Sequence, residues 1–168
     1  FLDEARQNRV LIMDWDVHHG NGTQHIFETD PRVLFVSLHG HPDYLYPGTG
    51  YRHETGVDQG KGFTVNIPFL PGATDDEYRE AFETIVEPAV ERFAPQSILI
   101  SAGFDAHQDD PIGCARLSDH AFEWMTRRVI AWSERYSDGR LLSVLEGGYD
   151  LDALRRNVAE HVRLLESE

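Results

Sequence analysis

The sequence has very little cysteine and lysine. Of its 168 residues, Cys114 is the one cysteine, so no disulfide can form within the chain, which is typical of a reducing compartment. Lys61 is the one lysine and the formal net charge is −14, which argues against binding of a nucleic-acid backbone. The charge favours cationic partners, although general solubility explains it equally well.

Long apolar runs and a secretory leader are also missing. The hydrophobic segments are too short to span a bilayer, and the first residues, FLDEARQNR, lack the basic start and apolar centre of a signal peptide. The length of 168 residues predicts a single domain over residues 1–168. The two absences predict that it has no membrane segment and lies in the cytoplasm, or in the nucleus of a eukaryote. Residue 1 is Phe, and residues 1–8 read as the last turns of a helix, so we expect a fold that is incomplete at its N-terminus.

Apolar runs alternate with helical patterns along the whole chain. Strands are expected at residues 10–13, 33–38, 63–68, 97–101 and 141–145, and helices at 23–28, 75–93, 118–136 and from 150 onward. This alternation predicts an α/β fold with a mostly parallel sheet covered by helices. The Gly- and Pro-rich segment 42–62 is expected to be a long loop, and loops of this length are usually functional.

The first strand runs directly into the segment DWDVHH. If residues 14–18 are extended, Asp14, Asp16 and His18 project to the same side. Such charged groups at the mouth of an apolar strand are costly unless something pairs them, which favours a metal site over simple turn capping.

Two later strands also end in groups that can carry chemistry. The fourth leads to Asp105 and the fifth to Tyr149. Because the carboxyl ends of parallel strands lie along one edge, these groups can converge with Asp16 and His18. A catalytic zinc takes three protein ligands, and a tyrosine can donate to a carbonyl oxygen as negative charge develops there.

Each of these later residues also has a simpler interpretation. Asp105 can hold the turn that follows it, and GGYD is a common junction before a helix, with Asp150 as the N-cap. Asp109 and Asp110 are typical turn formers, and one of them can support the metal ligands.

Six motifs in register resemble a known family. DWDVHHGNGTQ, VSLH, LYPGTG, TVNIP, ILISAGFDAHQDDP and LEGGYDLDAL cover nearly the whole chain and are similar to the zinc-dependent histone deacetylases, particularly the class II-like and bacterial amidohydrolase members. The resemblance implies a three-layer α/β/α sandwich of the arginase/deacetylase type. It also implies a metal-dependent amidohydrolase that removes an acetyl group from acetyl-lysine or an acetylated polyamine by means of metal-activated water.

Carried over residue by residue, the resemblance assigns the site. It implies a zinc held by Asp16, His18 and Asp105, a catalytic Tyr149, and a structural potassium. The remaining implied residues are Tyr46 and Ile112 in the substrate channel, Asp14, Ser37 and Leu38 at the potassium, and Phe27, Asp30 and Val33 at a second monovalent cation. A mixed carboxylate and imidazole set also suits Fe²⁺.

The chain departs from the family pattern in its histidines. Members carry a tandem histidine pair, the general base, well before the metal motif, and no such pair precedes Asp14 here. We therefore expect the isolated chain to be inactive. The other histidines are expected in loops near the site (His39, His41, His53 and His107) or on exposed helix surfaces (His25, His120 and His161).

Two alternatives stay open. A binuclear, arginase-like hydrolase would use Asp105 and His107 for a second metal. A non-catalytic fragment would bind a metal or acyl-lysine without turnover. The oligomeric state is not determined by the sequence, but a missing stretch of sheet would expose an apolar edge and favour association.

Overall fold

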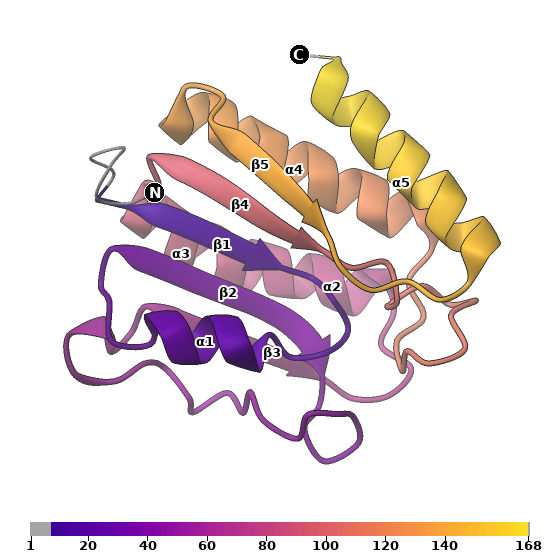
Figure 1. Cartoon of the computed structure of the whole chain (residues 1–168), viewed down its shortest axis with the longest axis horizontal. Helices are drawn as coiled ribbons and strands as arrows, with labels where there is room; N and C mark the ends of the chain where they lie inside the picture. The colour runs from indigo at the N-terminus through magenta and orange to yellow at the C-terminus, as the bar shows by residue number, and fades with distance from the viewer. Residues whose placement is uncertain (1–7, 168) are drawn as a thin grey trace.

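The fold is built on a sheet of five parallel strands. The computed structural model describes residues 8–167, and the strands follow the order β3-β2-β1-β4-β5 in space (Figure 1). The expectation of five strands is confirmed. A helix over residues 1–8 falls almost entirely outside the described residues. The strands are β1 (Val10–Asp14), β2 (Val33–Gly40), β3 (Thr64–Phe69), β4 (Ser97–Ala102) and β5 (Leu141–Leu145).

Helices lie on both faces of this sheet. In Figure 1, α2, α3 and α4 lie behind it, α1 lies in front, and α5 runs beside α4. The α/β fold with a parallel sheet is therefore confirmed. The helices are α1 (Asn21–Phe27), α2 (Asp75–Ala81), α3 (Glu87–Phe93), α4 (Asp119–Ser137) and α5 (Leu151–Glu166), with a 3-10 turn η1 (Asp58–Gly60) and a π-helical turn η2 (Phe82–Val86).

Strand β1 shows why its sequence is apolar without interruption. Leu11 and Met13 point into the large core under α2, α3 and α4, whereas Val10 and Ile12 point into a smaller cluster that includes Phe27 of α1. All five residues of β1 are buried because successive side chains face opposite sides of a sheet that is covered on both.

The strand register brings the candidate residues to one edge. Asp14, the last residue of β1, pairs with Ser37 of β2 and Ser101 of β4, and Ala102 pairs with Leu145 of β5. The segments that follow β1, β4 and β5 therefore begin side by side, as the parallel arrangement predicts.

Two helices differ from the sequence expectation. Helix α1 begins at Asn21 after Gly20, two residues before the expected start at Thr23. The expected single helix over 75–93 contains the wide turn η2 directly before α3. Pro88 explains this turn, because its ring would clash with the carbonyl four residues earlier, at Thr84, in a regular α-helix.

The expectation that His161 is an exposed helix residue is wrong. Its side chain is buried, with Nδ1 2.8 Å from the Thr126 hydroxyl oxygen and Nε2 2.8 Å from that of Ser143. Thr126 donates to the Phe122 carbonyl and therefore accepts from His161 Nδ1, so Ser143 donates to Nε2. Burial lowers the pKa of His161 to about 4, and this neutral ring joins α4, β5 and α5.

The depressed pKa of His161 makes stability depend on pH. The unfolded chain binds a proton near pH 6.5 and the folded chain near pH 4, so stability is complete above pH 6.5 and falls as the pH drops toward 4, by at most about 3 kcal/mol. Urea unfolding at pH 7, 5.5 and 4.5 should show this loss, and His161→Gln should reduce its slope; part of the slope remains because burial also lowers the pKa of His39 to about 4. The exposed-site control His120→Gln should retain the slope; an identical slope in all three proteins would contradict the assignment.

Strand β5 leaves apolar side chains exposed at the edge of the sheet. Leu142, Val144 and Leu145 are each about half exposed, and β4 is the one strand that pairs with β5 among the described residues. An edge strand with exposed apolar side chains is a template for pairing with another chain.

Within residues 8–167, none of the helices has the length and apolar character needed to cross a membrane.

We expect the isolated chain to associate through β5. Size-exclusion chromatography with light scattering should give a mass above the 19.2 kDa of one chain, and the double change Leu142→Lys and Val144→Lys should restore the monomer. Ile26→Lys, which alters an exposed apolar residue on α1, is the control and should leave the association unchanged. A single monomer peak for the unmodified chain would contradict this prediction.

Candidate metal centre

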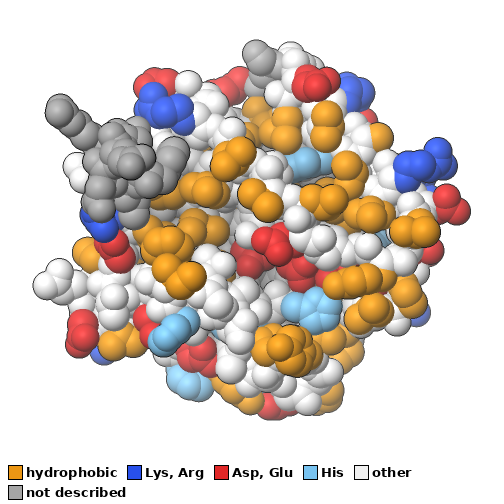
Figure 2. All heavy atoms as spheres, viewed as in Figure 1, with side chains coloured by type: hydrophobic (Ala, Val, Ile, Leu, Met, Phe, Trp, Pro, Cys, Tyr) orange, Lys and Arg blue, Asp and Glu red, His pale blue; other side chains and the backbone are white. Residues whose placement is uncertain are grey.

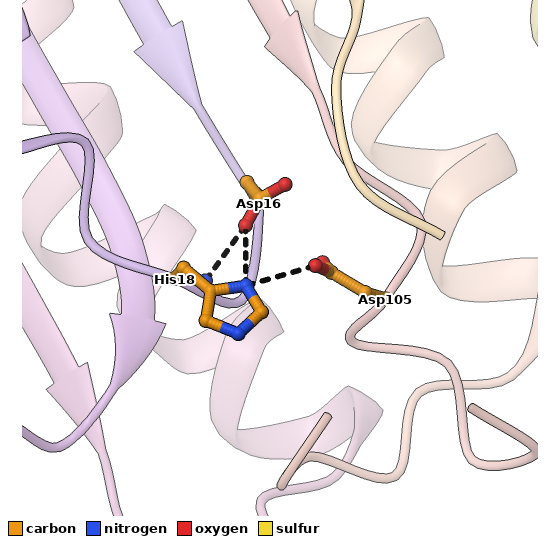
Figure 3. Close-up of side chains that lie close together, drawn as sticks. All are labelled: Asp16, His18 and Asp105. Atoms are coloured by element: carbon orange, nitrogen blue, oxygen red, sulfur yellow. Dashed lines mark hydrogen bonds and ion pairs between the residues drawn. The ribbon is translucent and has the colours of Figure 1, made fainter. Parts of the chain in front are cut away.

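Three side chains meet where β1 and β4 end. Asp16 and His18 follow β1, Asp105 follows β4, and the three side chains point toward one another (Figure 3). His18 Nδ1 lies 3.1 Å from Asp16 Oδ1 and 3.0 Å from Asp105 Oδ2. One ligand atom from each residue lies within 4.8 Å of the others, so the trio predicted from the sequence is brought together.

Backbone amides hold the two carboxylates in place. The Gly147 amide donates to Asp16 Oδ2 and the Val17 amide donates to Asp105 Oδ1, both at 2.8 Å. The His18 amide also donates to Asp16 Oδ1 at 2.8 Å. These hydrogen bonds fix the direction of the carboxylates.

The electrostatics of the trio favour a positive charge between the carboxylates. Burial and the nearby charge of Asp16 raise the pKa of Asp105, although the hydrogen bond from His18 opposes this. Burial acts in the same sense on Asp16, but hydrogen bonds from His18 and Gly147 lower the pKa of this carboxyl overall. The hydrogen bonds to Asp105 and Asp16 raise the pKa of His18 to about 10.

The trio fits a divalent metal by its donor atoms. Two carboxylate oxygens and one imidazole nitrogen form the three-ligand set of a catalytic zinc, which leaves a coordination position open. The site also opens to solvent, since Asp16 and His18 line a cavity of about 540 Å³. Fe²⁺ is compatible with the same donors.

Tyr149 and Tyr46, which the family resemblance assigns to catalysis and to the substrate channel, both border this cavity. The two residues are 49% and 78% exposed. Ile112 is exposed as well, but it is not among the residues that line the cavity. Figure 2 shows the molecule from the same side as Figure 1, and acidic side chains gather at the centre of this face. The full cavity lining is Asp14, Asp16, His18, His19, Gly20, Thr23, Tyr46, Ser101, Leu145, Glu146, Gly147 and Tyr149.

The residues expected at monovalent cations lie close together at two places. Asp14 and Ser37 are buried neighbours on paired strands, and burial together with the charge of Asp16 raises the pKa of Asp14 well above its usual range. Leu38 follows Ser37 in β2. At the second place, the Asp30 amide donates to the Phe27 carbonyl and the Val33 amide to the Asp30 carbonyl.

The histidines outside the trio are engaged elsewhere. His107 Nδ1 accepts a hydrogen bond from the Asp109 amide at 3.1 Å and Nε2 lies 3.1 Å from the Asp119 carboxylate, so neither ring nitrogen is directed to a second metal beside Asp105. The expectation that His39 lies in a loop is wrong, because it belongs to β2. There the ring is buried between the Ser37 hydroxyl and the Gly50 carbonyl.

Two glycines, Gly103 and Gly147, lie against the carboxylates of the trio. A Cβ at Gly103 would lie 2.5 Å from Asp16 Oδ2, and one at Gly147 would lie 2.2 Å from Asp105 Oδ2 and 2.6 Å from Asp16 Oδ2. The sequence shows glycines after both strands but not what they make room for. Glu146, which also lines the cavity, was missed although it directly precedes the GGY motif.

Comparisons with known proteins identify the family of the chain. Residues 2–165 match the histone deacetylase domain. A protein described as "Probable deacetylase" from Archaeoglobus fulgidus is 51% identical over 144 residues, which are 86% of this chain and 40% of that protein. The crystal structure of the HDA15 HD domain superposes with a TM-score of 0.91 at 41% identity, covering 97% of this chain and 46% of that one.

A third similarity is to an acetylpolyamine aminohydrolase from Burkholderia pseudomallei. Its crystal structure gives a TM-score of 0.88 at 32% identity and covers 98% of this chain and 46% of that one. The chain belongs to the histone deacetylase family. It spans less than half the length of these three proteins.

Removing a carboxylate from the trio should abolish the metal site. In calorimetric titrations with Zn²⁺, we expect about one ion per unmodified chain and an affinity at least about 100-fold weaker in Asp16→Ala and Asp105→Ala, because each change removes a direct ligand. Asp109→Ala, which alters an exposed carboxylate outside the trio, is the control and should bind normally. Equal stoichiometry and affinity in all four proteins would contradict the site.

Proposed function

We propose that this chain carries the metal-binding and tyrosine side of a deacetylase active site. The substrate is an N-acetylated amine, on a lysine side chain or on a polyamine, and the products are the free amine and acetate. The observation that carries the proposal is the convergence of Asp16, His18 and Asp105 beneath the cavity bordered by Tyr149, in a chain of the histone deacetylase family.

The trio would hold the metal, for which zinc is proposed, and Asp14 with its neighbours would hold a structural potassium. When bound, zinc supplies a Lewis acid that polarises the amide carbonyl and activates water for hydrolysis. The protein's part is to fix the ligands, which the amides of Val17 and Gly147 do through hydrogen bonds.

Tyr149 would stabilise the negative charge that develops on the carbonyl oxygen. The phenol must be protonated to donate a hydrogen bond, and partial desolvation together with the charges of Asp105 and Asp16 raises its pKa. The group is therefore a donor at neutral pH. Tyr46, on the same cavity, would form an aromatic wall along the acyl chain.

Proton transfer needs a general base beyond these residues. His18 and His19 form the one tandem histidine pair in the sequence. His18 belongs to the metal trio, and His19 has both ring nitrogens within hydrogen-bond distance of Thr49 and Gln24. The family match and the similarity to an acetylpolyamine aminohydrolase support the proposed substrate class, and the net charge of −14 is compatible with a cationic amine.

A deacetylation assay tests the proposal. The zinc-loaded chain and a longer form, extended to the length of the relatives that it matches, are compared on an acetyl-lysine peptide and on N-acetylputrescine. We expect the longer form to be about 10²- to 10⁴-fold faster, since general-base catalysis is worth that much. In the longer form, Tyr149→Phe should lower kcat by about 10²- to 10³-fold, because the change removes a hydrogen-bond donor to the oxyanion.

Tyr44→Phe is the control for this assay. Tyr44 is an exposed tyrosine of the 42–62 loop that does not line the cavity, so its change should leave kcat unaltered. Robust turnover by the 168-residue chain alone would contradict the claim that the base lies elsewhere. Zinc binding without turnover in either form would favour a non-catalytic binding protein.

A further inference from the structure

Asp110 joins two segments of the site that are far apart in sequence. Its side chain is 9% exposed and accepts four backbone hydrogen bonds. Oδ1 accepts from the amides of Ile112 at 2.9 Å and Gly113 at 3.0 Å. Oδ2 accepts from the amides of Tyr149 at 2.7 Å and Asp150 at 3.4 Å.

The two ends of this connection matter to the site in different ways. The first pair of amides belongs to the turn after Asp105, which returns so closely that a Cβ on Gly113 would lie 1.8 Å from the Asp105 carbonyl oxygen. The second pair consists of the amides of Tyr149 and Asp150, at the start of the segment that leads into α5. One carboxylate therefore fixes the distance between the segment that carries a metal ligand and the segment that carries the tyrosine.

Few polar contacts of Tyr149 itself hold the residue in position. The preceding Gly148 has φ +143°, a conformation that other residues rarely adopt, and a Cβ there would lie 2.7 Å from Leu154 Cδ1, so the path of the chain at this point depends on glycine. Half of the Tyr149 side chain is exposed, and within residues 8–167 no hydrogen bond reaches its phenol. The hydrogen bond from the Tyr149 amide to Asp110 Oδ2 is thus the main polar contact that places the residue.

We propose that Asp110 is a positioning residue for Tyr149, which it aims at the metal trio through the backbone. This inference rests on the proposed role of Tyr149. Misplacement of a catalytic group by about 1 Å can lower turnover by about 100-fold, so a single buried carboxylate can control the rate without touching substrate.

Amide hydrogen exchange on the chain gives the direct test. In the unmodified protein, the Tyr149 amide should exchange at least tenfold more slowly than that of Asp152, which lies in the first turn of α5, where helix amides have no partner within the helix. This measurement needs no variant. Equally fast exchange of the two amides would overturn the proposal.

Asp110→Asn separates the two ends of the connection. Asparagine keeps one acceptor oxygen, which we expect to remain with Ile112 and Gly113, while its NH₂ group faces the Tyr149 amide and cannot accept from it. Tyr149 exchange should rise at least tenfold, with Gly113 protection and Zn²⁺ affinity changed less than twofold. Unchanged Tyr149 exchange would overturn the proposal, and so would a loss of Zn²⁺ affinity equal to that of Asp105→Ala, which would assign Asp110 to the metal site.

Asp109→Asn is the matched control, because Asp109 is the adjacent carboxylate and faces His107 and Arg156 instead of Tyr149. It should leave Tyr149 exchange unaltered. In the deacetylation assay of the longer form, Asp110→Asn should lower kcat by about 10- to 100-fold and change KM less than twofold. If Tyr149→Phe has no effect on kcat while Asp110→Asn still frees the Tyr149 amide, the proposed role of Tyr149 fails and the positioning contact stands.

Discussion

The structure depends on holding like charges together at the end of an apolar strand. Asp14, Asp16 and Asp105 lie near one another where β1 and β4 finish, and the first and third are buried. Burying such charges is unfavourable unless hydrogen bonds and an opposite charge compensate. The amides of Val17 and Gly147 and the ring of His18 provide part of this compensation, and a divalent cation among the trio would provide the rest.

This requirement determines the local sequence as much as the ligands do. Two loops from different strands must approach the carboxylates within hydrogen-bond distance, and any Cβ at Gly103 or Gly147 would occupy the space of the ligand oxygens. Glycine there serves close approach of the backbone. Asp110 also brings backbone segments close together, because its carboxylate accepts hydrogen bonds from the amides of two segments at once.

The parallel sheet and the metal trio could be predicted from the sequence because both follow from simple periodicities. Alternation along residues 14–18 placed Asp16 and His18 on one side, and parallel strands brought Asp105 to them. His161 could not be placed in the same way, since its burial depends on α4 and β5. The spacing Ala153, Asn157, His161 and Leu164, all buried in α5, is nevertheless helical and marks the stripe that faces α4.

Metal binding and catalysis are separable in this chain. Among the described residues, the hydrogen bonds that orient the carboxylates of the trio come from the segment after β1 and from the Gly147 turn after β5. A general base is different, because it must face the substrate from the open side of the cavity, and the ring of His19 is instead turned to Thr49 and Gln24. In the proposed reaction, the sheet edge would therefore supply the electrostatic half, while proton transfer would depend on a group other than His18 and His19.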